Sequence, residues 1–305
     1  MNVTISLNEG ARVYYEEDPE KEGYLGGVFL ARAFANRGHK VSIVHPRDVD
    51  KNNQGVFTGN IYSFSREKGF VKSNENGLLK GDVFFVYGLG EDKESSRVTS
   101  DFMGLLYPLE EQYGLMLNSA ESTSYESKDK LKTLDLPFVP GFDISSKRDL
   151  CSLLKSGEKV IAKPKIGFQG IGIRFLENIK DMGVIGDDAI GDYVYQKYVP
   201  ANEERRYIFL DNELIIRRRI EKRGSPGNEV CTNVNLMEGY EHEIDIARNA
   251  IAQCQMFYAA VDFRGDYVLE INGSGTGIAP PTVKNQMDSY NLGWPIVQAV
   301  ERRCL

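Results

Sequence analysis

The sequence predicts an α/β domain over about the first 120 residues, followed by an α+β region in the rest of the chain. Apolar strands alternate with helical segments near the N-terminus, which is typical of a mostly parallel sheet covered by helices. Later in the chain, apolar runs follow one another across short polar turns, which is typical of antiparallel hairpins. A third observation is the segment from Ala260 to Asn272, a hairpin pattern with polar residues that can share one face.

Four strands and two helices account for the N-terminal domain. The first helix has apolar residues at helical spacing, and Gly38 follows it as a helix-ending residue. The first strand is followed by Asn8-Glu9-Gly10 rather than by a G-x-G-x-x-G fingerprint, which disfavours a nicotinamide-binding domain. The expected strands are Val3–Leu7, Val41–Val44, Gly81–Tyr87 and Leu115–Asn118, and the expected helices are Tyr24–Asn36 and Phe102–Tyr113.

The second part of the chain begins with a polar helix and a linker that contains two prolines. We expect the helix over Ser122–Thr133 and extended backbone over Leu136–Phe142, because each proline restricts the residue before it. Hairpins mixed with helices then predict an α+β arrangement. The expected strands are Val160–Pro164, Ile171–Phe175, Tyr193–Val199, Arg206–Leu210 and Leu214–Ile220, and a helix is expected over Glu243–Tyr258.

Composition argues against several classes of function. The 305-residue chain has a net charge of −7 and a pI near 5.3, which disfavours sequence-independent binding to nucleic acid or to an anionic membrane. No apolar run reaches the length of a membrane span and no secretory signal is expected, so we predict a cytoplasmic protein. The four cysteines lack metal-ligand spacing, and the three histidines argue against a multi-histidine metal site or a catalytic triad.

The C-terminal hairpin contains Asp262, Glu270 and Asn272. Side chains alternate along a strand, so Glu270 and Asn272 share a face, with Val268 beside them. A three-residue loop, Arg264 to Asp266, or an equivalent bulge places Asp262 on that face, whereas a two-residue loop would place it on the other. Such an oxygen-rich group suits Mg²⁺. The alternative is a half-buried hairpin with one solvated polar face.

A second pattern is a lysine at the end of a strand, followed by a glycine-containing loop. Lys163 could neutralise phosphate charge, while the glycines from Gly167 to Gly172 let backbone N–H groups approach the oxygens. The order differs from that of a P-loop, where the lysine follows the glycines. A plain hairpin turn is the alternative for this pattern alone.

Taken in order, these patterns resemble those of an ATP-grasp ligase. More narrowly, the chain resembles the branch of prokaryotic glutathione synthetases and ribosomal-protein glutamate ligases. The resemblance covers residues 120–305 and extends more loosely over the first domain. It implies a Rossmann-like α/β pre-ATP-grasp domain at 1–120, then a two-lobed ATP-grasp module with a central lobe at 121–195 and a C-terminal lobe at 196–305. The residues that carry it are Lys130, Lys163 and its loop, Gln196-Lys197-Tyr198-Val199, Glu203-Glu204-Arg205-Arg206 and the hairpin of Asp262, Glu270 and Asn272.

The resemblance implies that ATP binds between the two lobes. The two lysines would contact phosphates, the glycine loop would close over them, and the linker backbone would bond the adenine edge. Glu204 would accept the ribose hydroxyls, with Glu203 as the alternative, and a solvated helix lysine is the alternative for Lys130. The implied nucleotide-binding residues are Lys130, Lys163, Gly167, Gly170, Gln196, Lys197, Val199 and Glu204.

The resemblance also implies a metal and catalytic set. Asp262, Glu270 and Asn272 would bind Mg²⁺, two ions in all, with Mn²⁺ as a substitute, and Glu270 would bridge them. Alternation places Arg217 and Arg219 on one face of their strand and Arg218 on the other. Arg219 best matches the family arginine that grips the transferred phosphoryl group, with Arg217 beside it. A solvated basic strand is the alternative.

Two features bear on the substrate. Many relatives carry R-x-N where this chain has Cys231-Thr232-Asn233, so Asn233 can keep a metal or phosphate role while the arginine is replaced. Gly273 and Ser274 begin a Gly/Ser/Thr loop that could present N–H groups and a hydroxyl to a substrate carboxylate. A flexible turn is the alternative for this loop.

The function implied is ATP-dependent ligation of a carboxylate to an amine through an acyl phosphate, releasing ADP and phosphate. The first expectation for the carboxylate is an amino acid or a γ-glutamyl compound. The alternatives are an amino-acid ligase that acts on a peptide or protein tail, and a non-catalytic ATP-binding regulatory protein. The expected partners are small-molecule carboxylate and amine substrates and a second copy of the chain in a homo-oligomer, without nucleic acid or membrane.

Overall fold

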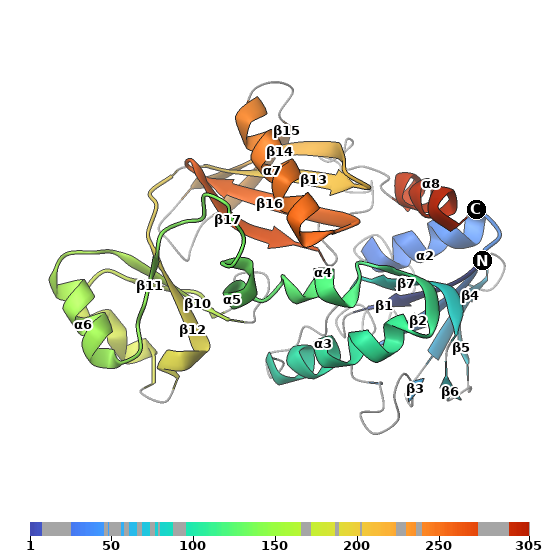
Figure 1. Cartoon of the computed structure of the whole chain (residues 1–305), viewed down its shortest axis with the longest axis horizontal. Helices are drawn as coiled ribbons and strands as arrows, with labels where there is room; N and C mark the ends of the chain where they lie inside the picture. The colour runs from blue at the N-terminus through green and yellow to red at the C-terminus, as the bar shows by residue number, and fades with distance from the viewer. Residues whose placement is uncertain are drawn as a thin grey trace.

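The chain folds around three main sheets that follow one another across the molecule (Figure 1). The N-terminal sheet lies at one end, the small middle lobe lies at the other, and the C-terminal sheet lies between them. The computed structural model describes residues 1–7, 26–45, 48, 56–57, 61–65, 69–73, 77–78, 80–87, 96–165, 172–186, 189–201, 203–223, 230–235, 240–273 and 293–304.

The N-terminal sheet has the order β5-β4-β2-β1-β7-β8, and its last four strands are parallel, as predicted. Helices cover both faces: Leu30 and Phe34 of α2 pack on one, and Phe102 and Leu106 of α3 pack on the other. The antiparallel strands β4 and β5 extend one edge, and β3 and β6 form a separate pair. The bounds are β1 Asn2–Ser6, α2 Gly26–Asn36, β2 Lys40–Val44, β3 Val56–Phe57, β4 Ile61–Ser65, β5 Gly69–Ser73, β6 Gly77–Leu78, β7 Gly81–Val86, α3 Ser96–Glu110 and β8 Tyr113–Leu117.

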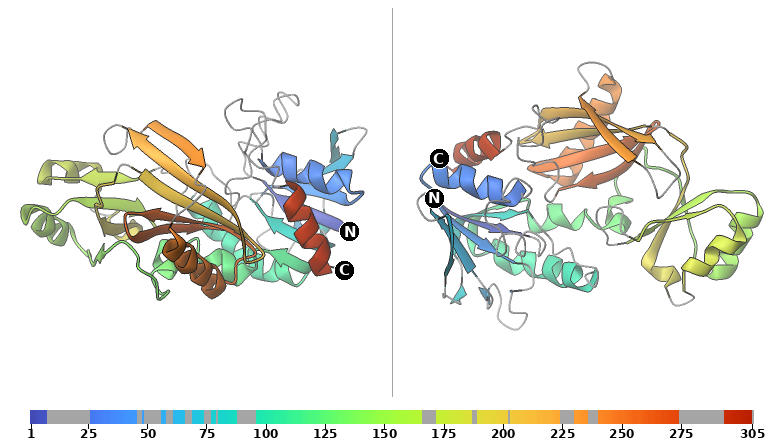
Figure 2. Two further views of the ribbon diagram at one scale, coloured as in Figure 1. Left: turned by 90° about the horizontal axis from the view of Figure 1, so that it is seen from above. Right: turned by 180° about the vertical axis from the view of Figure 1, so that it is seen from behind.

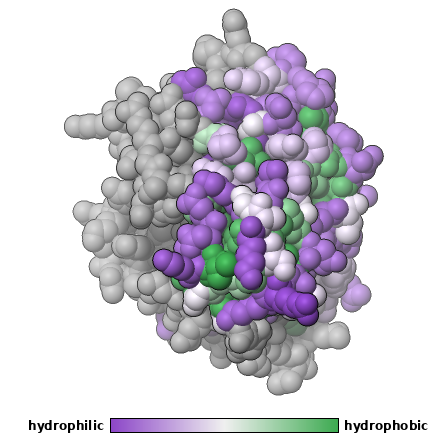
Figure 3. Space-filling model, turned by 90° about the vertical axis from the view of Figure 1, so that its left-hand side faces the viewer, coloured by the Kyte–Doolittle hydropathy of each residue, from purple (hydrophilic) through white to green (hydrophobic). Residues whose placement is uncertain are grey.

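The middle lobe is an antiparallel sheet, β11-β10-β12-β9, covered on one face by α6. Val160, Ala162 and Tyr195 point into the core beneath that helix. Because side chains alternate, Lys163 and Gln196 lie on the opposite face of the sheet. Hydrophilic residues predominate on the outer side of the molecule at this end, with hydrophobic ones in small patches (Figure 3). The bounds are β9 Gly141–Phe142, α6 Lys147–Lys155, β10 Val160–Pro164, β11 Arg174–Leu176, η3 Ile179–Val184, η4 Ile190–Asp192 and β12 Tyr193–Lys197.

The C-terminal sheet is antiparallel throughout, in the order β15-β14-β13-β16-β17. Helix α7 packs on one face, over Tyr207, Phe209, Val261 and Phe263. The helix ends at Cys254 rather than at the predicted Tyr258, because the next residue adopts a left-handed conformation and Tyr258 begins a strand. The bounds are β13 Glu203–Leu210, β14 Glu213–Arg223, β15 Val230–Asn235, α7 Glu241–Cys254, β16 Tyr258–Arg264 and β17 Tyr267–Asn272.

The last helix, α8 (Gly293–Cys304), returns to the N-terminal domain and packs beside α2 (Figure 2). Glu301 accepts hydrogen bonds from Arg37 at 2.7 Å and lies 2.9 Å from the imidazole of His39. The apolar core under this helix also contains Ile208 and Ile216 of the C-terminal sheet. One end of that sheet is therefore covered by the N-terminal domain, and its other end faces the middle lobe.

The segment between the first two sheets forms two short helices instead of the single predicted helix over Ser122–Thr133. These are α4 (Ala120–Ser124) and α5 (Lys128–Leu131). Serine side chains bond local backbone groups here, a competition that shortens helices: the hydroxyl of Ser124 donates to the Glu121 carbonyl. The apolar residues between Tyr125 and Phe138 then pack on the C-terminal sheet, where Val268 bonds the linker backbone. The predicted boundaries at 120/121 and 195/196 stay predictions.

Asn118 joins the N-terminal domain to the C-terminal sheet. Its amide donates to the carbonyls of Tyr258, at 2.8 Å, and Gly273, at 2.9 Å. Its oxygen accepts from the N–H groups of Phe257 and Tyr258 at 2.7 and 3.1 Å. Asn118 is 3 % exposed, so all four bonds are shielded from water.

Asn118→Ala is expected to lower the free energy of unfolding by about 2–4 kcal/mol, because it leaves several buried backbone groups without a partner. Urea denaturation followed by circular dichroism measures the change. Asn36→Ala, at an exposed position on α2, is the matched control and should change stability by less than about 0.5 kcal/mol. Equal stability of the two variants would contradict the linking role of Asn118.

Candidate functional site

The turn of the C-terminal hairpin has two residues, Gly265 and Asp266, rather than three, and the hairpin has the bulge that was predicted as the equivalent. A bulge compensates: Asp262 pairs with Glu270 and Phe263 pairs with Val268, so Leu269 has no partner. Asp262 and Glu270 therefore lie directly opposite each other and on one face. Val268 was predicted on that face, but the bulge turns it to the other face, where it packs in the α7 core.

Asn272 completes the oxygen-rich group. Its amide donates to Asp262 at 3.3 Å and to Glu270 at 3.2 Å. Asp262 is buried, while Glu270 and Asn272 are half-buried. Within the described residues, no three His, Cys, Asp or Glu side chains gather as a metal-binding group, so these two carboxylates and one amide are the candidate donors.

Arg206 holds Asp262 from the neighbouring strand β13. Its Nε and Nη2 atoms bond the two oxygens of the carboxylate, each at 2.6 Å. Burial raises the pKa of Asp262 to about 6, against the opposing effect of this arginine. Arg206 had no predicted role of its own. The sequence feature that could have indicated Arg206 is its spacing from Glu204, because residues two apart lie on one face of a strand.

Two lysines from outside the C-terminal sheet lie close enough to interact electrostatically with Glu270. Burial lowers the pKa of Lys163, on β10, and of Lys128, on α5, while the charge of Glu270 opposes both shifts. Burial alone would raise the pKa of Glu270, but Lys163 and Lys128 outweigh it, so that pKa lies below its ordinary value. The middle lobe, the linking segment and the C-terminal sheet thus meet at Glu270.

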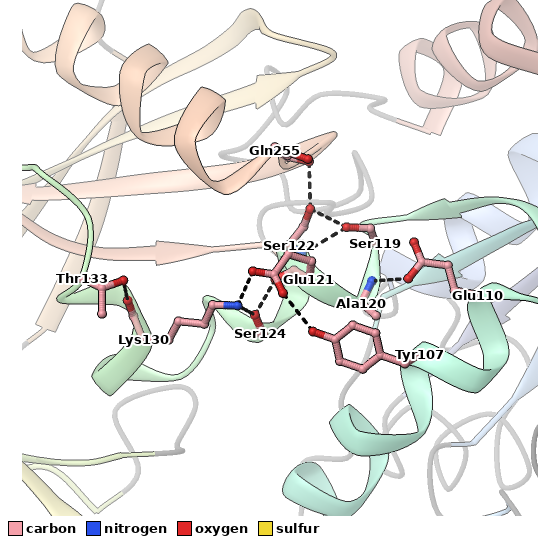
Figure 4. A network of polar contacts seen from close by, with 10 residues as sticks. All are labelled: Tyr107, Glu110, Ser119, Ala120, Glu121, Ser122, Ser124, Lys130, Thr133 and Gln255. Carbon is pink, nitrogen blue, oxygen red and sulfur yellow. Dashed lines mark hydrogen bonds and ion pairs between the residues drawn. The ribbon is translucent and has the colours of Figure 1, made fainter.

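Lys130, the lysine predicted to contact phosphate, points toward α4 instead (Figure 4). It forms an ion pair with Glu121 at 2.5 Å, bonds the hydroxyl of Ser124 and lies 4.4 Å from the ring centre of Tyr125. Glu121 also accepts a bond from Tyr107. The neighbouring Lys128, which was not among the predicted site residues, interacts electrostatically with Glu270.

The register shows which arginines of β14 lie in the row of Asp262 and Glu270. Pairing with β13 places Arg218 opposite Arg206, and Arg206 is opposite Asp262, so Arg218 belongs to the row of the site. Arg217 and Arg219, the predicted catalytic arginines, lie on the α7 face. Arg217 is 3.1 Å from Glu241, and the carboxylate of Glu203 lies 3.7 Å from Arg219.

The register places the predicted residue Glu204 at this face. Glu204 belongs to the row of Ile220 and Asn233 and is 8 % exposed, with Arg264 3.4 Å away. Glu203 is on the opposite face, bonded to Arg205 at 3.0 Å. The two acidic residues that were alternatives in the sequence therefore have different surroundings.

The predicted adenine-binding segment lies at the end of β12. The side-chain oxygen of Gln196 is buried and, among the described residues, has no hydrogen-bond partner. Lys197 is exposed and lies 3.6 Å from Glu158, so its ammonium group points away from the sheet face of Lys163. A methyl group of Val199 packs against the hairpin turn at Gly265.

Gly273, predicted to bind substrate, is packed tightly at the end of β17. Its N–H group donates to the Glu126 carboxylate at 2.6 Å, so a substrate carboxylate would have to displace Glu126. Three further predicted residues, Gly167, Gly170 and Ser274, lie outside the described residues.

Comparison with known proteins gives matches at the level of structure. No family model matches the sequence, and no curated protein matches it. The structure of the ATP-grasp ligase PsnB with minimal precursor, Mg and ADP is 13 % identical, with a TM-score of 0.61, over 100 % of this chain and 97 % of that one. The D-cycloserine synthetase DcsG is 12 % identical, with a TM-score of 0.63, over 100 % of both chains.

D-alanyl-alanine synthetase A from Vibrio cholerae is also similar. It is 12 % identical, with a TM-score of 0.62, and the match covers 100 % of this chain and 98 % of that one. At these identities the likeness concerns the fold and leaves the narrower glutathione synthetase branch a prediction. The predicted fold class is confirmed: the chain has the ATP-grasp fold over its whole length.

Proposed function

We propose that the chain is an ATP- and Mg²⁺-dependent ligase that joins a carboxylate to an amine. The observation that carries the proposal is the convergence of Lys163, Lys128 and Arg206 on the paired carboxylates Asp262 and Glu270. Cations around two carboxylates, where the middle lobe meets the C-terminal sheet, are suited to bind the phosphates of a nucleoside triphosphate together with its metal.

Asp262, Glu270 and Asn272 would hold the metal. Mg²⁺ takes oxygen donors and binds proteins through one or two carboxylates, completing its shell with water and phosphate oxygens, so this donor set fits. The sequence predicts two ions and substitution by Mn²⁺. When bound, the metal neutralises charge on the phosphates of the nucleotide.

The remaining groups would bind the nucleotide. We assign the phosphate contacts to Lys163 and to Lys128, which takes the role predicted for Lys130. Gln196, Lys197 and Val199 remain the proposed adenine-binding segment, Glu204 the ribose acceptor, and Gly167 and Gly170 part of the phosphate loop. Gln196 supports this assignment because its buried oxygen can accept a bond from an amino group.

The transferred phosphoryl group would lie against the arginine row. Arg206 and Arg218 share the face of the carboxylates, and a guanidinium fork binds phosphate oxygens in pairs. A substrate carboxylate would attack the γ-phosphate, and an amine would then displace phosphate from the acyl phosphate. Positioning and electrostatic stabilisation suffice for both steps, so no side-chain nucleophile is required.

Formation of ADP and phosphate that depends on Mg²⁺, a carboxylate and an amine together is the test of the proposal. A panel of amino acids, γ-glutamyl compounds, dipeptides and longer peptides supplies the substrates. Binding of ATP without substrate-dependent ADP formation across this panel would instead support the non-catalytic regulatory protein.

A peptide substrate is the second candidate. The observation in its favour is that a structure that spans the whole chain, that of PsnB, is a complex with a precursor. Turnover with long peptides and not with free amino acids would establish this alternative. Cytoplasmic localisation and a homo-oligomeric state stay predictions from the sequence.

Arg218→Ala is expected to lower kcat by about 100-fold, because it removes a charged donor at the phosphoryl group. Arg217→Ala, one residue away and on the α7 face, is the matched control and should leave kcat within about twofold of wild type. Steady-state ADP release measures both. The reverse result would favour the face predicted from the sequence alone.

Lys128→Ala is expected to raise the KM for ATP by about tenfold or more, through loss of a charge-assisted bond to phosphate. Lys130→Ala removes an ammonium group that is already paired with Glu121, so its effect on the KM should be small. Titration of ATP in the ADP-release assay separates them. A larger effect at Lys130 would restore the role that the sequence predicts for it.

A further inference from the structure

The Arg206–Asp262 ion pair occupies the site where we propose that a metal binds. Both oxygens of Asp262 accept bonds from the guanidinium at 2.6 Å, and one of them also lies 3.3 Å from the amide of Asn272. A metal ion that used Asp262 as a ligand would share its oxygens with the guanidinium of Arg206 and would meet that positive charge at close range. The pair therefore competes directly with the metal.

The charge around the site opposes a free cation as well. Lys163, Lys128 and Arg206 interact electrostatically with Glu270. Arg264 and Glu204, which lie 3.4 Å apart, add one charge of each sign near Lys163. These cations already balance the carboxylates of Asp262 and Glu270. An added divalent ion would meet repulsion, whereas a divalent ion that arrives with the negative charges of a triphosphate would not.

The two partners of the pair differ in their freedom to move. The side chain of Asp262 is 3 % exposed, whereas that of Arg206 is 27 % exposed. The aspartate side chain is therefore enclosed, whereas the arginine side chain is partly exposed to solvent. A guanidinium fork that binds a carboxylate in pairs can bind phosphate oxygens in the same way.

We propose that Arg206 closes the metal site to free Mg²⁺ and releases Asp262 only when nucleotide phosphates are present to bind the arginine. The inference rests on the proposed function and describes how metal binding at that site is regulated. The metal and the nucleotide bind together, and Arg206 couples the two binding events. Because such coupling is reciprocal, the metal raises nucleotide affinity by the same factor as the nucleotide raises metal affinity.

Direct binding of Mn²⁺, measured by electron paramagnetic resonance of the free ion, tests the inference without turnover. Without nucleotide, Arg206→Gln should bind Mn²⁺ about tenfold more tightly than wild type, or better. With a non-hydrolysable ATP analogue, wild type should gain Mn²⁺ affinity by a larger factor than Arg206→Gln does.

Arg248→Gln is the matched control, since it removes an exposed arginine from α7 of the same lobe. It should bind Mn²⁺ as wild type does, with or without the analogue. Arg206→Lys is the second variant and covers the case in which Arg206→Gln does not fold, as judged by circular dichroism. One ammonium group cannot bond both oxygens of Asp262 as the fork does, so its Mn²⁺ affinity without nucleotide should exceed that of wild type.

Equal Mn²⁺ affinities for wild type and both Arg206 variants, without nucleotide, would overturn the inference and leave the proposed function intact. Failure of wild type to bind Mn²⁺ with the analogue present would instead overturn the proposed metal–nucleotide site itself. The two failures therefore have different signatures in the same titration.

Discussion

Replacing Glu270 by glutamine is expected to lower kcat for ADP formation by about 100- to 1,000-fold, the range found when one preorganised electrostatic contact is removed from an active site. The large effect is expected because of the position of Glu270 in the site. Glu270 is the carboxylate at which Lys163, Lys128 and the proposed metal ligand Asn272 meet. Glutamine keeps the shape and removes the charge that organises these groups.

Steady-state release of ADP, with circular dichroism to verify folding, measures the effect of Glu270→Gln. Glu241→Gln provides the control: it makes the same substitution in the same lobe, on an exposed side chain of α7. Its kcat should stay within about twofold of wild type. A Glu270→Gln enzyme with full turnover would refute the assignment of Glu270 to the metal site.

Replacing Glu243 by alanine is expected to lower the free energy of unfolding by about 3–5 kcal/mol, the usual cost of breaking a buried ion pair from one side. Glu243 is buried on α7 and accepts bonds from Arg205 at 2.6 Å and from the hydroxyl of Tyr207 at 2.7 Å. The variant leaves the guanidinium of Arg205 buried without its main counter-charge.

Urea denaturation gives the free energy for Glu243→Ala, and Glu241→Ala on the same helix serves as the exposed control. The control should change stability by less than about 0.5 kcal/mol. Similar stabilities for the two variants would show that the Arg205–Glu243 pair does not hold α7 on the sheet. Both substitutions are in the C-terminal lobe, on opposite faces of its sheet. Glu270→Gln is expected to affect kcat, and Glu243→Ala is expected to affect stability.

The C-terminal hairpin shows which structural features can be predicted from the residues of the hairpin alone. Its two strands and the shared side of Glu270 and Asn272 follow from alternation and a glycine turn, whereas the bulge brings Asp262 to that side. The length of the turn did not follow, because the bulge at Leu269 depends on Val268 and Phe263 packing together beneath α7. Packing against a distant helix is not visible in the hairpin's own residues.

The arginine strand shows the limit of the same reasoning. Alternation separates Arg218 from Arg217 and Arg219 correctly, but it does not say which side faces the site. That choice comes from the pairing of β14 with β13 and of β13 with β16. The same pairing brings Arg206 to Asp262 across a sequence separation of 56 residues.

The lysines of α5 illustrate a third case. The resemblance to ATP-grasp ligases pointed to Lys130. The predicted helix is broken between α4 and α5. Lys130 pairs with Glu121, and Lys128 interacts electrostatically with Glu270. Serine side chains that bond nearby backbone groups favour such a break. The position of the break determines which lysine interacts with Glu270.

The sequence by itself determined the α/β domain, the antiparallel module after it, the ATP-grasp fold and the hairpin with its two carboxylates. These depend on periodicity and on motif order, which are properties of neighbouring residues. Only the tertiary structure decided which arginine and which lysine face those carboxylates, and that Arg206 holds Asp262. Side-chain direction at a site depends on strand register and helix ends, which are set by contacts between residues far apart in the chain.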